Sequence, residues 1–401
     1  MSASSPHPGT VAIVNRSMHG TGTVAKSIEI ATALHEAGIP VEIWAARPDG
    51  VLAGRVPAGV PLIDLGRGRR LRGAGREMLA LGRTLRERKP ALLLSAGKHF
   101  HLVARGGLLL SRRRSSTVFG GRASNSGVRP GRGPIRNAIA NMLYRPKYRG
   151  MDFIVAVSSD IEREVAGKLG PHAPPIHCIP NGVDLSPAWA SRMPARSHRW
   201  IDDPALRVLV SAGRLDPQKG YDVLLRALAE LRDVSDLRLL IAGDGGPDTR
   251  KTLERLAEGL GVADRIDFLG YLADPFALIG KGDLFVLPSR WEGASNALLE
   301  AMACGLPIVA TDCPGGSREI LGGGAHGRLT PVDDPRALAA AIRAELAERR
   351  DPAIQRAAAR RFDLTSCMDE YVSLLDRYRR HGAVSSVGQP LSAPQYRPRF
   401  G

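Results

Sequence analysis

The sequence predicts an α/β protein made of two doubly wound domains, each a parallel β-sheet with helices on both faces. Short apolar stretches alternate with helical stretches along both halves of the chain, and repeated strand–helix–strand units imply parallel sheets with buried faces. At 401 residues the chain is too long for one ordinary core, so two domains are expected. A segment containing several Pro, Ser and Arg residues, 184–204, is the expected linker.

Strands and helices are predicted in alternating order along the chain. In the first half, strands are expected at 10–15, 40–43, 61–65, 91–95, 117–119, 153–157 and 176–179, and helices at 22–37, 74–88, 134–143 and 160–169. In the second half, strands are expected at 207–211, 237–242, 266–268, 284–287, 308–310 and 327–329. The helices expected there are 221–231, 249–260, 274–279, 297–303, 317–321 and 335–349.

Four segments follow from this pattern. Residues 1–190 and residues 191–364 are expected to form one Rossmann-like domain each. A last helix at 365–381 is expected to pack back toward the N-terminal domain. The tail, 382–401, has the composition of a disordered segment.

The net charge of +16 is concentrated in the first half of the chain. Residues 1–185 contain 27 Lys and Arg against 12 Asp and Glu, and residues 65–150 contain 21 against 2, whereas the remaining 216 residues hold 29 against 28. Such a field suits an anionic membrane surface, a nucleic acid or a polyanionic substrate. The four cysteines are scattered without a C-x-x-C pair, which favours a reducing compartment and argues against a zinc site. We expect a cytoplasmic protein. Peripheral attachment to the inner face of the cell membrane is a further expectation.

The segment Ser289–Asp312 contains two carboxylates with seven residues between them, Glu292 and Glu300. Glu292 follows an apolar strand, and Glu300 lies in a helical stretch that ends at Gly305. In open α/β sheets, a strand, a turn and a helix N-terminus present polar groups to a ligand. The spacing therefore predicts Glu292 at the mouth of a site and Glu300 about two turns down the helix.

A second signal lies in Val208–Tyr221, where a strand ends in a glycine turn flanked by Arg214 and Lys219. Two cations beside helix amides can clamp a diphosphate, although solvated loop charges are the alternative. Gly243 ends another strand, and Gly270 and Tyr271 end a third. These two turns either let a backbone approach a ligand closely or are ordinary tight turns.

In the first half, Gly20, Thr21 and Gly22 lie between a strand and a helix, in a loop that we expect to meet phosphate or acceptor across a cleft. His99 and His101 follow the strand at 91–95, at the end where open sheets bind ligands. The sequence does not choose between them, and a structural role is the alternative.

The stretch 134–149 combines an apolar helical face with four basic residues, Arg136, Arg145, Lys147 and Arg149. It is either an interfacial helix on anionic lipid or a core helix with a solvated basic edge.

Together these motifs resemble the retaining glycosyltransferases of family 4, which have the two-Rossmann GT-B fold with the two domains facing a cleft. In the second half the resemblance rests on G-R-L-D-P-Q-K-G, Glu292–Leu321 and Gly327–Pro335; in the first half it is looser, through Gly20–Gly22, V-S-S and I-P-N-G-V-D.

The resemblance implies that residues 1–190 bind the acceptor and residues 191–364 the nucleotide sugar, and it implies a role for each matching residue. Glu300 would accept hydrogen bonds from the ribose of a nucleotide sugar, and Glu292 from hydroxyls of the donor sugar. Arg214 and Lys219 would bind the diphosphate. His99 or His101 would correspond to the family's histidine after its fourth strand. The remaining donor-binding positions would be Gly293, Ala294, Ser295, Asn296, Ala297, Gly20, Thr21, Gly22, Gly243, Gly270 and Tyr271.

We therefore predict a retaining glycosyltransferase that needs neither a metal nor a cofactor. It would move a hexose from a nucleotide sugar to a lipid-linked or cell-envelope glycan such as lipopolysaccharide. The donor expected is a UDP sugar, and a GDP sugar is the second choice. The sequence contains no D-x-D pair to hold a metal. Three alternatives are a soluble transferase acting on a small sugar or storage glucan, a nucleotide-sugar epimerase of the same fold, and a nucleic-acid-binding protein. The last leaves the carboxylate pair unexplained and has no aromatic stacking platform, so no nucleic-acid partner is expected.

Overall fold

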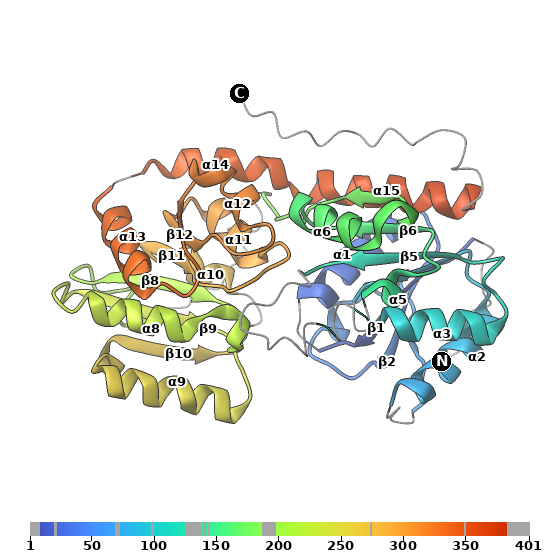
Figure 1. Ribbon diagram of the computed structural model, residues 1–401, viewed down its shortest axis with the longest axis horizontal. Coiled ribbons are helices and arrows are strands. Elements are labelled where there is room, and N and C mark those ends of the chain that lie inside the picture. Colours follow the sequence, from blue (N-terminus) through green and yellow to red (C-terminus); the bar gives the residue numbers. More distant parts are fainter. Residues whose placement is uncertain are drawn as a thin grey trace. The chain divides into compact units, whose positions relative to one another are not determined.

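The computed structural model describes residues 9–19, 22–68, 73–97, 100–125, 138, 142, 144–186, 198–272, 275–348 and 350–382. They form two compact α/β units, each with its own parallel sheet (Figure 1). The first unit contains the described residues up to Pro180 and again from Ser366, and the second contains Asn181–Thr365. The chain therefore enters the second unit before the expected boundary at 190, because Val183 already exchanges backbone hydrogen bonds with Phe362 and Leu364 of that unit.

The first unit alternates strands with helices. Its elements are β1 (Val11–Ser17), α1 (Gly22–Glu36), β2 (Val41–Arg47), β3 (Leu62–Asp64), α2 (Ala74–Arg88), β4 (Leu92–Ser95), α3 (His101–Ser111), β5 (Val118–Ala123), α5 (Tyr144–Tyr148), β6 (Phe153–Ala156), α6 (Ser159–Leu169) and β7 (Ile176–Cys178). The seven strands are parallel, in the order β3-β2-β1-β4-β5-β6-β7. Strands β4 and β6 are buried along their whole length, and β1 and β2 are buried except at their last residues, which is typical of a sheet covered by helices on both faces.

The last helix, α15 (Leu364–His381), packs on the first unit. The Tyr378 ring stacks on Phe153 of β6 with centroids 4.1 Å apart, and the hydroxyl of Tyr371 accepts a hydrogen bond from Arg122 of β5 at 3.0 Å. Both tyrosines are buried. These contacts fix α15 against strands β5 and β6 of this sheet.

The second unit repeats the alternation. Its elements are β8 (Arg207–Ala212), α8 (Tyr221–Glu230), β9 (Leu237–Ala242), α9 (Pro247–Leu260), β10 (Ile266–Gly270), α10 (Phe276–Ile279), β11 (Leu284–Leu287), α11 (Asn296–Cys304), β12 (Ile308–Thr311), α12 (Ser317–Ile320), β13 (Arg328–Thr330), α13 (Pro335–Ala347) and α14 (Pro352–Ala359). The six strands are parallel in the order β10-β9-β8-β11-β12-β13. Successive residues of β8 belong to two different hydrophobic cores. Leu209 packs in one core, and Val208 and Val210 pack in the other, because side chains alternate along a strand.

Three elements differ from the prediction for physical reasons. β5 extends through Gly120 and Gly121, which the sequence pattern takes as a strand end. A Cβ at Gly120 would lie 2.2 Å from the Phe153 ring, and one at Gly121 would lie 2.4 Å from the Met151 sulfur, so the two glycines make room for two buried side chains. Helices α3 and α14 were not predicted; the Asp351 side chain accepts a hydrogen bond from Ala353 N at 2.8 Å and caps α14. The predicted helix at 134–143, apart from residues 138 and 142, and most of the predicted tail lie outside the described residues.

Candidate functional site

The sheet of the second unit reverses its strand order between β8 and β11, which lie side by side. Ligands of open α/β sheets bind outside the carboxyl ends of the strands at such a switch point. The chain leaving β8 passes through Gly213 to Lys219, and the chain leaving β11 leads to Glu292. The topology therefore brings the two motifs that the sequence singled out to one edge of one sheet.

The glycines that end β8, β9 and β10 lie against one another. Gly213 and Gly243 have φ values of 156° and 154°, and a Cβ at Gly243 would lie 1.8 Å from the Gly213 carbonyl oxygen. The Gly243 amide donates to the Gly270 carbonyl at 2.8 Å. No side chain fits at Gly243, so the backbones of neighbouring strands form the floor of this edge.

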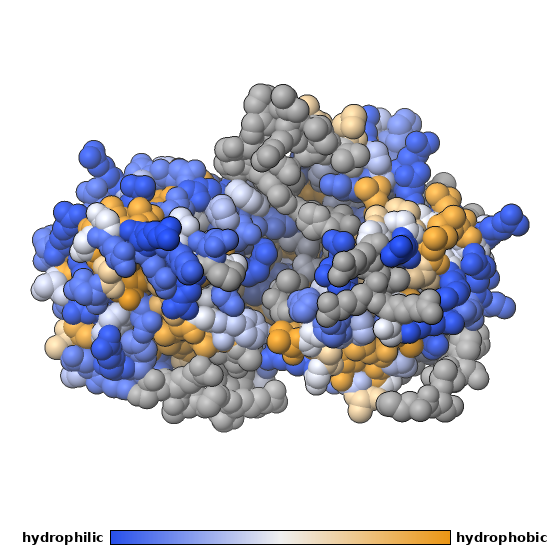
Figure 2. Space-filling model, turned by 90° about the horizontal axis from the view of Figure 1, so that it is seen from below, coloured by the Kyte–Doolittle hydropathy of each residue, from blue (hydrophilic) through white to orange (hydrophobic). Residues whose placement is uncertain are grey.

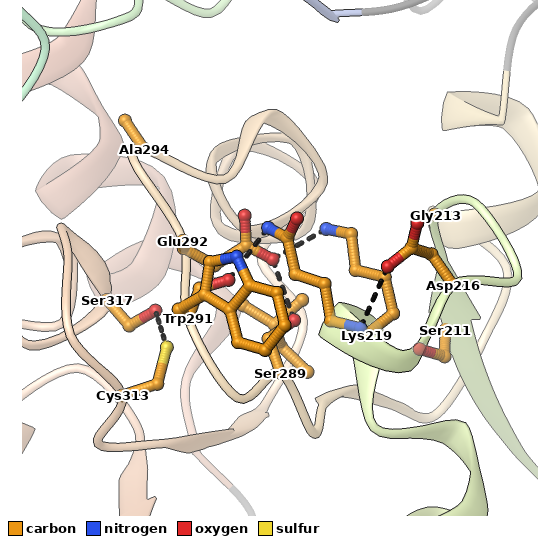
Figure 3. A network of polar contacts seen from close by, with 12 residues as sticks. Ser211, Gly213, Asp216, Lys219, Ser289, Trp291, Glu292, Ala294, Cys313 and Ser317 are labelled. Carbon is orange, nitrogen blue, oxygen red and sulfur yellow. Dashed lines mark hydrogen bonds and ion pairs between the residues drawn. The ribbon is translucent and has the colours of Figure 1, made fainter. Parts of the chain in front are cut away.

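The Glu292 carboxylate is the centre of the polar network at this edge (Figure 3). Its Oε1 accepts hydrogen bonds from Lys219 Nζ at 2.6 Å and from Ser289 Oγ at 2.7 Å. The side chains of Glu292 and Lys219 are 7% and 16% exposed. Both donors reach the same oxygen, so Oε2 makes no hydrogen bond within the part of the chain that the structure describes and can accept one from a ligand.

Arg290 and Gln218 fasten the loops that carry this pair. Gln218 Nε2 donates to the Trp291 carbonyl at 2.8 Å, and Arg290 N donates to the Gln218 carbonyl at 2.7 Å. The Arg290 guanidinium reaches both carboxylate oxygens of Asp222 at 2.7 and 2.9 Å, and Nε reaches Asp333 at 2.6 Å. Such bidentate pairs fix geometry as well as charge. The relative position of Lys219 and Glu292 therefore depends on Arg290.

The turn after Glu292 is held mainly through its carbonyl groups. Asn181 Nδ2 donates to the Ala294 carbonyl at 3.1 Å and to Asn296 Oδ1 at 2.7 Å, and Gly316 N donates to the Gly293 carbonyl at 2.6 Å. Ser295 precedes α11 in an extended conformation and its hydroxyl makes no capping bond. The first amides of α11 lack partners within the helix, so they remain available to an anion.

Glu300 lies nearer to the start of α11 than predicted. The helix begins at Asn296, so Glu300 is about one turn from its N-terminus and not two. Its side chain is partly exposed, while Leu298 and Leu299 beside it are buried. Gly293 to Ser295 belong to the turn before the helix and not to the helix itself, so the second carboxylate lies close to the helix amides.

Three other predicted positions of this edge are accessible. Arg214 has a side chain that is 60% exposed, and its guanidinium lies 3.9 Å from Asp216. Tyr271 is exposed and Gly270 has open space on its Cβ side. These groups can reach a ligand without displacing a packed contact.

Two further groups close to Glu292 are kept uncharged by burial. Burial raises the pKa of the Cys313 thiol to about 11, and the Glu292 carboxylate adds to that rise. Burial also raises the pKa of Tyr221 well above its usual range, and its hydroxyl donates to the Gly213 carbonyl at 3.1 Å. The thiol and the phenol therefore bring no charge to the site at neutral pH.

In the first unit, the structure describes His101 but not His99. His101 is the first residue of α3 and has no exposed surface; its Nδ1 lies 2.8 Å from Ser95 Oγ, and its ring packs on Tyr148. A side chain without exposed surface cannot contact a ligand unless the protein rearranges, so this placement argues against the expectation that His101 lines the site. Gly22 begins α1.

The predicted membrane residues lie around α5. Arg145 and Arg149 are exposed, Lys147 is partly exposed, and Arg145 Nε donates to the Lys168 carbonyl at 2.9 Å. The tyrosines at both ends of α5 are buried. The predictions for Gly20, Thr21, His99 and Arg136 lie outside the described residues.

Within the described ranges, no group of three or more His, Cys, Asp or Glu side chains could hold a metal ion. The same residues include no helix with the length and apolar character that crossing a bilayer requires.

Sequence reasoning missed the residues that support the pair. Ser289 and Arg290 lie inside the quoted motif, but their partners are distant: Arg290 contacts Asp222 and Asp333, 68 and 43 residues away. Asn181 lies in the I-P-N-G-V-D motif, which carried no expectation of contact with the turn at Ala294. Only the fold connects these residues.

Two family models match the chain, "Glycosyltransferase Family 4" over residues 21–187 and "Glycosyl transferases group 1" over residues 206–348. A D-inositol 3-phosphate glycosyltransferase of Geodermatophilus obscurus is 36% identical over 212 residues, which is 49% of this chain and 46% of that protein. A GDP-mannose-dependent alpha-(1-6)-phosphatidylinositol monomannoside mannosyltransferase of Mycolicibacterium smegmatis is 36% identical over 226 residues, 53% of this chain and 58% of that protein. The matches thus span about half the length of these curated relatives.

Among solved structures, Anabaena Alr3699/HepE in complex with UDP and glucose is similar, with a TM-score of 0.74 and 22% identity, over 91% of this chain and 98% of that one. At this identity the likeness concerns the fold.

Proposed function

From the premise that the chain belongs to the glycosyltransferases whose Family 4 and group 1 models it matches, we propose that it transfers a hexosyl group from a nucleotide sugar to an acceptor. Its two parallel-sheet units have the GT-B fold, which confirms the predicted fold class. The observation that carries the proposal is the contact between Lys219 and Glu292 at the switch point of the second sheet.

In this proposal the two ends of the donor find complementary groups along one edge. Glu292 Oε2, which accepts no bond from the described residues, receives a hydroxyl of the donor sugar. Glu300, close to the start of α11, receives the ribose hydroxyls. The sugar end and the nucleoside end are thus held by carboxylates, which accept hydrogen bonds from hydroxyl groups.

The diphosphate between them meets positive groups. Lys219 lies 2.6 Å from Glu292, so a bound diphosphate would share its ammonium with that carboxylate. Arg214 and the first amides of α11 supply further donors. Departure of the nucleoside diphosphate leaves negative charge on the phosphate, and preorganised donors lower the barrier to that step; removing one such group typically costs about 2.7–4 kcal/mol.

We further propose a metal-independent transfer with retention of anomeric configuration, in which the acceptor attacks on the face that the leaving group vacates. A covalent intermediate would need a carboxylate with room to attack, whereas Glu292 is buried and bonded to Lys219 and Ser289. The positive groups above take the part that a metal ion takes in other transferases.

The acceptor proposed is a lipid-linked or cell-envelope glycan at the cytoplasmic face of the membrane. Two observations support it: the excess of basic residues at 65–150, and a relative whose name gives phosphatidylinositol monomannoside as acceptor. A transferase acting on a small sugar is the alternative.

The donor is tested by measuring the thermal stability of the protein with a panel of UDP and GDP sugars in the presence of EDTA. A ligand that binds only the folded state raises the Tm. We expect one UDP sugar to do so, and the corresponding hexoside to form only when acceptor is added. Product formation without acceptor would indicate an epimerase, and loss of binding in EDTA would contradict metal independence. The anomeric configuration of the product, read by NMR, tests retention.

Glu300→Ala tests the placement of the nucleoside. Loss of hydrogen bonds to a charged group should weaken donor binding roughly tenfold to hundredfold, measured as Kd by calorimetry. Glu258→Ala, which removes an exposed carboxylate from α9 of the same unit, should leave Kd unchanged. Equal Kd values for the two variants would contradict the proposed placement.

A further inference from the structure

The outer face of α2 carries an unusual stripe of exposed residues. Arg76, Leu79, Arg83 and Arg86 are all exposed, while Leu81 and Leu85 are buried. The exposed positions are separated by three or four residues and therefore lie on one face of the helix. Leu79 is 62% exposed in the middle of this stripe.

Helix α3 extends the stripe into a patch. A Cβ at Gly82 of α2 would lie 3.3 Å from the Leu110 Cβ, and Arg86 Nη1 donates to the Leu110 carbonyl at 2.9 Å. Leu109 and Leu110 are 56% and 48% exposed. Leu79 is one helical turn from Gly82, so the leucines of the two helices lie close together. We call the surface formed by Arg76, Leu79, Arg83, Arg86, Leu109 and Leu110 the α2–α3 face.

Exposed apolar side chains are concentrated here. Seven large apolar residues of the described chain are exposed, and three of them belong to the α2–α3 face. Figure 2 shows apolar residues gathered among hydrophilic ones on the half of the molecule that holds the first unit. Exposed leucines that cluster usually mark a contact surface, whereas scattered ones need no explanation.

The charge of the α2–α3 face is not neutralised by acidic neighbours. Only two acidic residues occur at 65–150, Glu77 and Glu87. Glu77 is buried and accepts a hydrogen bond from Arg16, and Glu87 pairs with Arg67. Among the described residues, Arg76 and Arg83 have no carboxylate within ion-pair distance. Leucines surrounded by unneutralised arginines suit a surface that is both anionic and apolar.

We propose that the α2–α3 face docks on an anionic lipid bilayer, with the leucines entering the boundary between headgroups and acyl chains and the arginines meeting lipid phosphates. The inference rests on the proposed function only because both assume that the protein acts at a membrane surface. A nucleic acid would also attract the arginines, but it offers no apolar layer for three leucines. The surface differs from the one the sequence predicted, around α5.

The test uses the full chain and vesicles of phosphatidylcholine, with or without phosphatidylglycerol, in a sedimentation assay. Binding is expected only to the anionic vesicles. Leu79→Ser combined with Leu110→Ser should reduce binding at least tenfold, because the variant keeps every charge but loses the apolar contact. Ile354→Ser, which removes an exposed apolar side chain from the second unit, should bind like the wild type. Thermal stability checks that the exposed changes leave the fold intact.

A second pair of variants separates charge from apolar contact. Arg76→Gln with Arg83→Gln should weaken binding roughly fivefold for each arginine removed, while Arg226→Gln with Arg336→Gln, exposed arginines of the second unit, should not. Equal binding to both kinds of vesicle, no binding to either, or equal loss in all four variants would overturn the proposal. Binding to duplex DNA that survives the leucine changes would instead indicate a nucleic-acid partner. Donor binding in solution needs no membrane, so failure here leaves the transferase proposal standing.

Discussion

The loops after β8 and β11 and the α2–α3 face both use arginine, but in opposite ways. Arg290, between the two loops, is bonded to Asp222, Asp333 and a backbone carbonyl and is largely buried. On the α2–α3 face, Arg76 and Arg83 project into solvent with no carboxylate in ion-pair distance among the described residues. A guanidinium that is fully bonded fixes geometry; one without a counter-charge creates a field. The same residue type therefore fixes the loops of the candidate site in one unit and, in our proposal, forms a docking surface in the other.

The largest effect on this comparison should come from removing the cation of the site. Lys219→Ala takes away the group proposed to stabilise the departing diphosphate. The activation free energy should rise by about 2.7–4 kcal/mol, so kcat should fall roughly a hundredfold to a thousandfold. Lys251→Ala, an exposed lysine on α9, should leave kcat unchanged. Steady-state kinetics with saturating donor measures both variants. A loss of less than tenfold in Lys219→Ala would mean that Lys219 serves only to pair with Glu292.

The backbone floor of the site is tested by Gly243→Ala. The added Cβ would lie 1.8 Å from the Gly213 carbonyl oxygen, and the residue has a φ of 154°, so strands β8 and β9 must separate locally. Loss of about 3 kcal/mol in the free energy of unfolding is expected, measured by urea denaturation. Gly259→Ala is the matched control: it has open space in helix α9, where alanine stabilises by about 0.5–1 kcal/mol. Two changes of equal sign would contradict the close approach of the two glycine turns.

Arg290→Lys tests whether the fork of hydrogen bonds matters beyond its charge. Lysine keeps the positive charge but cannot bond both oxygens of Asp222 and also reach Asp333. We expect kcat/KM to fall by a factor that corresponds to about 2 kcal/mol of transition-state stabilisation. The change in kcat should exceed the change in donor KM, because Glu292 and Lys219 are displaced. Arg343→Lys breaks the bidentate pair with Asp233 on the surface of the same unit and should change neither constant. Equal kinetics for both lysine variants would assign Arg290 a purely structural role.

Sequence reasoning predicted the two doubly wound units and most strands because apolar periodicity reports burial directly. It also singled out Lys219 and Glu292, since glycine turns and a helix start leave local marks in the chain. It could not find Arg290 or Asn181, whose partners are fixed only by strand order. It missed the full length of β5, because Gly120 and Gly121 resemble a turn unless the Phe153 and Met151 side chains that pack on them are known.

For the α2–α3 face, the sequence indicated the charge but not the position of the exposed apolar residues. The sequence revealed its charge, since arginine counts need no structure, but it placed the apolar contact around α5 instead. The pattern of α2 indicates an amphipathic helix, yet only the structure shows that Leu79 and Leu110 lie outside the core. In our proposal the composition indicates the kind of partner, and the packing indicates which surface meets it.

The smallest effect concerns a histidine of the first unit that burial keeps uncharged, in contrast to the arginines that the α2–α3 face displays. His177 of β7 lies 3.2 Å from the Tyr378 hydroxyl of α15, and burial, together with Arg377, lowers its pKa from 6.5 to about 4. As pH falls below 6.5 the unfolded chain binds a proton that the folded chain does not. Stability is therefore complete above pH 6.5, declines below it, and stops declining near pH 4.

Between pH 7.5 and 5 this histidine should cost about 2 kcal/mol of stability. Hydrogen exchange of peptides from β7 and α15, taken relative to the exchange rate of an unfolded chain at the same pH, should show protection factors that fall over that interval. His177→Phe keeps an aromatic ring but cannot titrate, so the part of the change that His177 causes should disappear, whereas His172→Gln, an exposed histidine five residues earlier, should retain it. If the protection factors at α15 respond to pH equally in both variants, then a different group titrates beneath this helix and the burial of His177 is not what makes the first unit less stable at low pH.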